Sequence, residues 1–186
     1  MNDFEPLLER VRTAAADSEN LQDPITLQNL DAAEQHLGFR LHPLLAALYT
    51  TVGNGGFGPQ DALLELCDAS PSDGTDTALG NYLTLASPDG SDPGWSWPAG
   101  VLPILDWGCG MMACVDCRGA DGTVLLFEPN ATDGEDVSTA WFVDSPSLAE
   151  WLQTWLDRRG WYEEDQLDGD SDMRPWPEAR WARTRW

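Results

Sequence analysis

The spacing of apolar residues changes twice along the chain, and this pattern constrains the fold more than any other feature. Up to residue 52, apolar positions recur every three or four residues, as on one face of a helix. From residue 62 to 143 they alternate or form short runs, which is typical of strands. Helical spacing returns at residues 147–156. Helices, then strands, then a helix predict an α+β domain.

Local signals define the ends of the N-terminal helices. Asp3 is suited to cap a first helix. A second helix should begin near Thr26 and end at Gly38, because a glycine adopts the left-handed conformation of a helix C-terminus at little cost. Pro43 fits the first turn of a third helix, where its missing N–H would be unpaired in any case. The glycines after Val52 should end that helix.

The middle of the chain predicts an antiparallel sheet. Short clusters of Asp, Gly, Ser and Pro separate the apolar runs, and strands joined by short turns pair antiparallel more readily than parallel. The strand candidates are residues 62–66, 101–105, 111–116, 123–127 and 139–143. We expect the N-terminal helices to pack on this sheet and a C-terminal helix to close it.

The closing helix has the clearest local signature. Ser147 and Glu150 have the spacing of a capping box, in which each side chain bonds the backbone of the other residue. An apolar stripe that includes Trp151 and Trp155 follows at helical spacing. Gly160 is the expected end of the helix.

The chain of 186 residues is expected to form one domain, residues 1–162, followed by a tail, residues 163–186. The tail begins with acidic residues and ends with arginines and tryptophans. Because its charges are opposed, we expect the Arg/Trp part to dock on its own domain or on a neighbouring copy through cation–π and charge contacts.

The charge of the chain excludes some classes of partner. It has 32 acidic residues against 10 basic ones, which gives a net charge of −22. Such a surface repels phosphate groups, so direct binding of nucleic acid or an anionic membrane is not expected. It attracts a basic protein partner. The alternative is that the acidity only confers solubility.

The sequence also predicts a cytoplasmic location. Its first residues show neither the basic nor the apolar region of a secretory signal, and no window approaches the roughly 20 apolar residues that span a bilayer. The thiols should therefore be reduced. The oligomeric state is left open.

No catalytic constellation is recognisable. Lysine is absent, which removes P-loop, Schiff-base and kinase chemistry. His36 and His42 lack the companions of a metalloprotease or hydrolase motif, so structural roles are expected for both. No catalytic residue and no cofactor are predicted.

The cysteines leave one chemical alternative open. Cys109, Cys114 and Cys117, with Cys67 as a fourth ligand, have a spacing that zinc sites use. However, Cys114 and Cys117 differ by an odd number of positions, so in a continuous strand they point to opposite faces. Buried free thiols are the favoured interpretation, and zinc or a disulfide are the alternatives.

The acidic run at residues 168–172 imitates the opening of a calcium loop. It departs from that motif because Met173 and Ala179 stand where glycine and glutamate are required. A solvated acidic segment is the expected interpretation.

An ordered set of short motifs runs through the chain. It comprises residues 37–38, 41–45, 48–49, 52–59, 94–98, 102–110, 114–117 and 127–130, and it precedes the closing helix. Together the motifs resemble the SUKH superfamily, which includes the Smi/Knr-type fungal cell-wall regulators and many bacterial proteins. The resemblance covers about residues 20–160 and implies helices against an antiparallel sheet.

The resemblance also implies function by binding, since many bacterial relatives are immunity proteins that neutralise toxins, often nucleases or deaminases. We therefore expect a non-catalytic, protein-binding module with a basic toxin domain as its partner. A small metal-binding protein or enzyme that uses the cysteines, and a housekeeping scaffold, are the alternatives. The partner-binding residues predicted from the glycine-rich turn and the Trp/Asp-containing loop are Asn54, Gly55, Gly56, Asp89, Asp92, Trp95 and Trp97.

Overall fold

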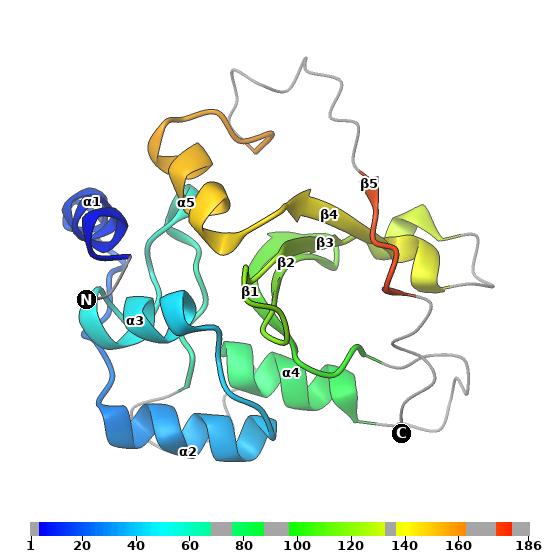
Figure 1. Cartoon of the computed structure of the whole chain (residues 1–186), viewed down its shortest axis with the longest axis horizontal. Helices are drawn as coiled ribbons and strands as arrows, with labels where there is room; N and C mark the ends of the chain where they lie inside the picture. Colours follow the sequence, from blue (N-terminus) through cyan, green and yellow to red (C-terminus); the bar gives the residue numbers. More distant parts are fainter. Residues whose placement is uncertain (1–3, 68–75, 88–96, 133–136, 163–173, 180–186) are drawn as a thin grey trace.

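Helices and one antiparallel sheet make up the described part of the chain, which confirms the expected α+β fold (Figure 1). The structure is a computed structural model and describes residues 4–67, 76–87, 97–132, 137–162 and 174–179. Its elements are α1 (Glu5–Ala15), α2 (Leu27–Leu37), α3 (Pro43–Thr51), α4 (Ala78–Ala86), β1 (Val101–Gly108), β2 (Met111–Asp116), β3 (Val124–Phe127), β4 (Trp141–Ser145), α5 (Leu148–Leu156) and β5 (Arg174–Pro175). Short 3-10 turns occupy Pro59–Asp61, Pro129–Ala131 and Val137–Ala140.

The strands form a meander in the order β1-β2-β3-β4-β5, with antiparallel pairing throughout. The turn between β1 and β2 is tight because Gly108, Cys109 and Gly110 all have positive φ. On the next hairpin, Phe127 of β3 lies opposite Trp141 of β4. This pairing places two large rings side by side near the middle of the sheet.

In the view of Figure 1, α1, α2, α3 and α5 lie to the left of the sheet and α4 lies below it. α4 lies against β1 and also contacts α2, whereas α5 contacts β4, α1 and α3. Side chains from α3 and β1 form the centre of the core, with no exposed surface at Leu44, Leu45, Leu48, Leu102 and Ile104. No helix in the described residues has the length and hydropathy to cross a membrane.

Capping interactions begin and end α2, and begin α5, where the sequence predicts. The Thr26 hydroxyl accepts a hydrogen bond from the amide of Asn29 at 3.1 Å and so begins α2. Gly38 follows this helix with φ of 77°. The Ser147 hydroxyl accepts from the amide of Glu150 at 3.1 Å and begins α5. Asp3 lies outside the described residues, and Phe4 occupies the N-cap position of α1.

The end of α5 differs from the expectation, because the helix stops before Gly160. Arg158 takes the left-handed conformation with φ of 53°. Its amide donates to the Trp155 carbonyl at 3.0 Å, and the amide of Arg159 donates to the Thr154 carbonyl at 3.0 Å. These two bonds form a common C-terminal cap, in which the residue just after the helix has the left-handed conformation. Here an arginine stands at this position, which glycine normally occupies.

The segment 62–66 is also not the strand that we expected. Only Leu63 forms a bridge to the sheet, opposite Leu105 of β1. The carbonyl of Glu65 then accepts from the amide of Ala78 at 2.8 Å, so the segment turns from the sheet to the start of α4. The sequence pattern had not predicted α4. Its first turn is capped by the Thr77 hydroxyl.

The C-terminal segment docks on its own domain, as expected. β5 follows residue 162, where we placed the domain end, and pairs with β4 through Phe142↔Pro175 and Val143↔Arg174. The cation of the cation–π contact comes from the domain and not from the tail: the guanidinium carbon of Arg118 lies 5.4 Å from the centre of the Trp176 ring.

Trp151 and Trp155 should differ in their contribution to stability. Trp151 is 1% exposed, and its indole N–H donates to Asp144 at 2.8 Å. Trp155 is only partly buried. We expect Trp151→Ala to lower the free energy of unfolding by about 3–5 kcal/mol. Trp155→Ala should cost about 1–2 kcal/mol, since less apolar surface is lost. Urea denaturation measures both, and equal losses would contradict the packing of α5.

Candidate functional site

Asn54, expected at a partner surface, instead holds the fold together. Its side chain is buried and bonds the segment that leads to α4: its carbonyl oxygen accepts from the amide of Leu66 at 2.9 Å, and its amide group donates to the carbonyl of Cys67 at 2.9 Å. Asn54 therefore satisfies backbone groups inside the protein and is not available to a partner.

The two glycines that follow are needed because backbone passes close to them. Gly55 and Gly56 have φ of 89° and 74°, and Gly55 is buried. A side chain on Gly56 would collide with the carbonyl of Asn20, and one on Gly55 would lie 2.6 Å from the amide nitrogen of Glu65. The turn is packed between two other segments, which gives both glycines a structural role, while partner contact at the half-buried Gly56 stays a prediction.

Trp97 is likewise a core residue. It is 1% exposed, its indole N–H donates to the carbonyl of Val101 at 2.7 Å, and its ring meets Trp141 and Phe127 edge-on at 4.9 and 5.2 Å. Its predicted role as a surface anchor is therefore wrong. The other predicted contacts, Asp89, Asp92 and Trp95, lie outside the described residues.

The structure does not bring the cysteines together as a metal site. Cys109 is exposed in the β1–β2 turn, whereas Cys114 is buried within β2 and Cys117 follows that strand. Burial raises the pKa of the Cys114 thiol and raises that of Cys117 to about 12. Cys67 is partly buried. In the described part of the chain, no three His, Cys, Asp or Glu side chains are placed to share a metal ion.

Both histidines bond backbone carbonyls, in keeping with structural roles. A ring nitrogen of His36 lies 2.7 Å from the carbonyl of Ala32, one turn earlier on α2. His42 is buried, and its Nε2 lies 2.9 Å from the carbonyl of Ala120.

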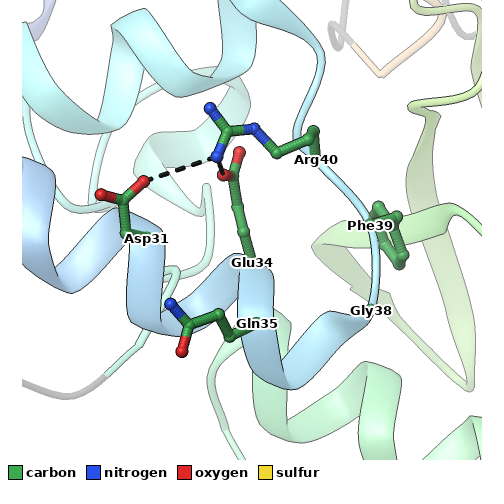
Figure 2. Close-up of a pocket in the computed structure, with 6 residues that line it drawn as sticks. All are labelled: Asp31, Glu34, Gln35, Gly38, Phe39 and Arg40. Atoms are coloured by element: carbon green, nitrogen blue, oxygen red, sulfur yellow. Dashed lines mark ion pairs between the residues drawn. The ribbon is translucent and has the colours of Figure 1, made fainter.

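A hollow of about 330 Å³ lies where α2 ends and the chain turns towards α3. We call it the α2 hollow. Figure 2 shows its lining residues, which are Asp31, Glu34, Gln35, Gly38, Phe39 and Arg40. Asp31, Glu34 and Gln35 share one side of α2 because residues three and four apart are neighbours on a helix. Gly38 then reverses the chain and brings Arg40 back over the helix (Figure 2).

The charges in the α2 hollow are arranged around one guanidinium. An oxygen of Glu34 lies 2.9 Å from Nη1 of Arg40, and an oxygen of Asp31 lies 3.5 Å from the same nitrogen. The second oxygen of Glu34 accepts from the amide of Leu41 at 2.9 Å. The Glu34 side chain is 6% exposed and that of Arg40 is 81% exposed. The carboxylate is therefore fixed, whereas the arginine reaches into solvent.

The α2 hollow has a rigid aromatic side. The Phe39 ring packs edge-on against Tyr82 of α4 with centroids 5.2 Å apart, which ties the loop after α2 to that helix. Two carboxylates, an amide and an aromatic ring suit the binding of a guanidinium or ammonium group. The lining contains no thiol, hydroxyl or imidazole that would act as a nucleophile or base. Sequence reasoning missed this site, although the spacing of Asp31 and Glu34 was visible.

A model of the SMI1 / KNR4 family (SUKH-1) matches residues 24–154, which is more than half of the chain. The chain belongs to the SMI1/KNR4 family. The resemblance to the SUKH superfamily is thereby confirmed. The family match includes the α2 hollow and strands β1 to β4, whereas β5 lies beyond it. A comparison with curated proteins finds no match.

Two glycines test whether the 53–56 turn is structural. Gly38 and Gly56 have similar φ, 77° and 74°, but an added side chain meets nothing within 4 Å at Gly38 and the Asn20 carbonyl at Gly56. Gly38→Ala should cost about 1–2 kcal/mol, the penalty of the left-handed conformation. Gly56→Ala should cost about 4 kcal/mol or more, because backbone must also move. Similar losses in urea denaturation would mean that the turn is not packed as described.

The thiols should differ in reactivity. At pH 7.5 we expect N-ethylmaleimide to modify Cys109 first, because it is exposed. Cys117, with its pKa raised to about 12, carries roughly three thousandfold less thiolate at this pH than an ordinary thiol of pKa about 8.5. Mass spectrometry of the labelled peptides measures the rates, and the unfolded chain is the control. Labelling of Cys117 as fast as Cys109 in the folded protein would contradict its burial.

Proposed function

We propose that this chain is an immunity-type protein that binds and neutralises a bacterial toxin, a nuclease or deaminase with a basic surface. Family membership is compatible with this function. The observation that carries the proposal is the α2 hollow, where a fixed carboxylate and an exposed one face a cation that the chain itself provides.

Arg40 occupies the position that a partner's arginine would take. The pair of Arg40 with Asp31, in which both side chains are exposed, is worth about 0–1 kcal/mol. The pair with the buried Glu34 costs more to break, so a partner's guanidinium must replace that of Arg40 beside this carboxylate. Glu34 keeps its bond to the Leu41 amide when Arg40 leaves, and its other oxygen is then open. Asp31, with a side chain 60% exposed, provides the second carboxylate. A guanidinium from a partner can bind both.

Net charge supports the same class of partner. The chain has a charge of −22, and proteins that act on nucleic acids present basic grooves. Long-range attraction speeds encounter between such surfaces, and the contacts made afterwards determine the rate of dissociation. Asp89, Asp92 and Trp95 stay in the proposal as further contacts, on the sequence argument alone.

The proposed role is binding without catalysis. The two carboxylates that line the α2 hollow are paired with Arg40, and the lining has no thiol, hydroxyl or imidazole. The alternative of a metal-binding protein or enzyme built on the cysteines is less favoured, because Cys109 is exposed while Cys114 is buried in the sheet. A housekeeping scaffold would share the fold but would not rescue cells from a toxin.

Binding kinetics with a toxin domain test the proposal. A toxin domain that this chain neutralises should lose its toxicity when the two are co-expressed, and the purified pair should associate. Association should slow as salt rises, since the Debye length falls from about 30 Å at 0.01 M to about 8 Å at 0.15 M. Glu34→Gln should raise the dissociation rate about tenfold or more, because a buried charged contact is lost. Its amide oxygen can still accept from Leu41.

The matched variants separate general charge from the α2 hollow. Asp31→Asn should lower the association rate about two- to fivefold at low salt. Glu150→Gln, an exposed acid on α5, removes the same charge elsewhere and should have a smaller effect. Asp89→Asn with Asp92→Asn should also slow association, and Trp95→Ala should mainly speed dissociation. Equal effects of Asp31→Asn and Glu150→Gln would rule out the hollow, and absence of growth rescue would rule out the immunity role.

A further inference from the structure

The C-terminal segment 174–179 lies along the edge of the sheet that β4 would otherwise leave open (Figure 1). β5 contributes two residues to the pairing. The amide of Trp176 then donates to the carbonyl of Trp141 at 2.8 Å. This is the pattern of an added strand, in which main-chain bonds to a sheet edge hold an extended peptide.

The Trp176 ring anchors this segment. It is 6% exposed and packs against Trp141 at 5.7 Å, and the guanidinium of Arg118 lies 5.4 Å from its centre. Arg118 also binds Glu178, two residues after the anchor, at 3.1 Å. One segment thus places an aromatic ring and an acid on the two sides of a single arginine.

Arg118 is held in place by the domain itself. Asp116, at the end of β2, accepts from Nε and Nη2 of Arg118 at 2.8 and 2.7 Å. Asp116 is buried, so its two bonds hold the guanidinium of Arg118 in one orientation. The groove made of the β4 edge, Trp141 and Arg118 is therefore built by the domain without help from the segment that fills it.

The groove and its occupant belong to one chain, so the contact between them is intramolecular. Eleven residues, 163–173, separate Tyr162 from β5 in the sequence. An intramolecular ligand acts at an effective concentration of the order of millimolar, and an external peptide has to compete with it. A competing peptide must displace the chain's own segment, so its apparent affinity is lower than its affinity for the open groove.

We propose that the β4 edge, Trp141 and Arg118 form a peptide-binding groove, which residues 174–179 close as a built-in ligand. Its external ligand is an extended protein segment with Pro-Trp and an acidic residue two positions after the Trp. Such a segment displaces the chain's own copy and adds to β4 in its place. The groove lies on the sheet edge and uses none of the residues that line the α2 hollow, so it is a second binding site that does not depend on the proposed toxin.

A synthetic peptide with the sequence of residues 172–180, Asp-Met-Arg-Pro-Trp-Pro-Glu-Ala-Arg, tests the groove by isothermal titration calorimetry. The full-length Trp176→Ala chain has a weakened built-in ligand and should bind the peptide with one-to-one stoichiometry. The wild-type chain should bind it at least about tenfold more weakly, because its own segment competes. The same peptide with Trp replaced by Ala should not bind. A folded Trp176→Ala chain that fails to bind the peptide would overturn the proposal, as would wild-type binding of equal strength.

A milder variant covers the case in which Trp176→Ala does not fold. Glu178→Gln in the full chain loses the contact with Arg118 but keeps the anchor, so its apparent affinity for the peptide should exceed that of the wild type. No gain over the wild type would overturn the proposal. A wild-type dimer in gel filtration that Trp176→Ala dissociates would assign the groove to a second copy, and so overturn closure within one chain.

Discussion

The fold depends on the turn at residues 53–56, where three distant segments meet through backbone hydrogen bonds. The amide of Asn54 donates to the carbonyl of Gln22, and the amide of Gln22 donates to the carbonyl of Gly55. The amide of Gly56 donates to the carbonyl of Leu63. Buried backbone groups must be paired, so the turn can exist only where these segments are in place. It joins the linker before α2 and the end of α3 to the segment around Leu63, which bridges to β1 and bonds the start of α4.

A second continuous feature is a column of aromatic rings that runs from the core to the sheet edge. Trp97 contacts Phe127 and Trp141, and Trp141 contacts Trp176. Aromatic pairs prefer such tilted and edge-on contacts and gain energy beyond the area they bury. The edge groove is therefore an extension of the core. Trp176, from the segment that pairs with β4, completes the column.

The sequence predicts features that depend on neighbouring residues. Thr26, Gly38 and Ser147 act within one helical turn, so the ends of α2 and the start of α5 are predicted correctly. α4 was missed although Thr77 is a good cap, because its uncharged sequence with an internal glycine gives a weak helical signal. The end of α5 was misplaced because Arg158, bonded to the last turn of the helix, adopts the left-handed conformation that local preference assigns to glycine.

The candidate site was less predictable because burial is set by residues far apart in the chain. Trp97 sits in a glycine- and proline-rich stretch typical of an exposed loop, yet its surroundings come from β3 and β4. The same holds for Glu34, one acid among 32, whose distinct role follows from the return of the chain at Gly38. Local spacing shows which side chains share a helix face, but not which of them the chain folds back to cover.

The placement of the arginines connects charge to function. Among the described residues, five arginines form ion pairs with acids of the same chain: Arg10, Arg12, Arg40, Arg118 and Arg159. Pairing places these bases locally but does not change the net charge of −22, which acts over distances of about a Debye length, roughly 8 Å at physiological salt. Beyond that distance, salt screens the attraction between the acidic chain and a partner, so net charge alone does not distinguish one basic partner from another. We therefore propose that specific recognition comes from sites where a carboxylate or an arginine is fixed in advance, as Glu34 and Arg118 are.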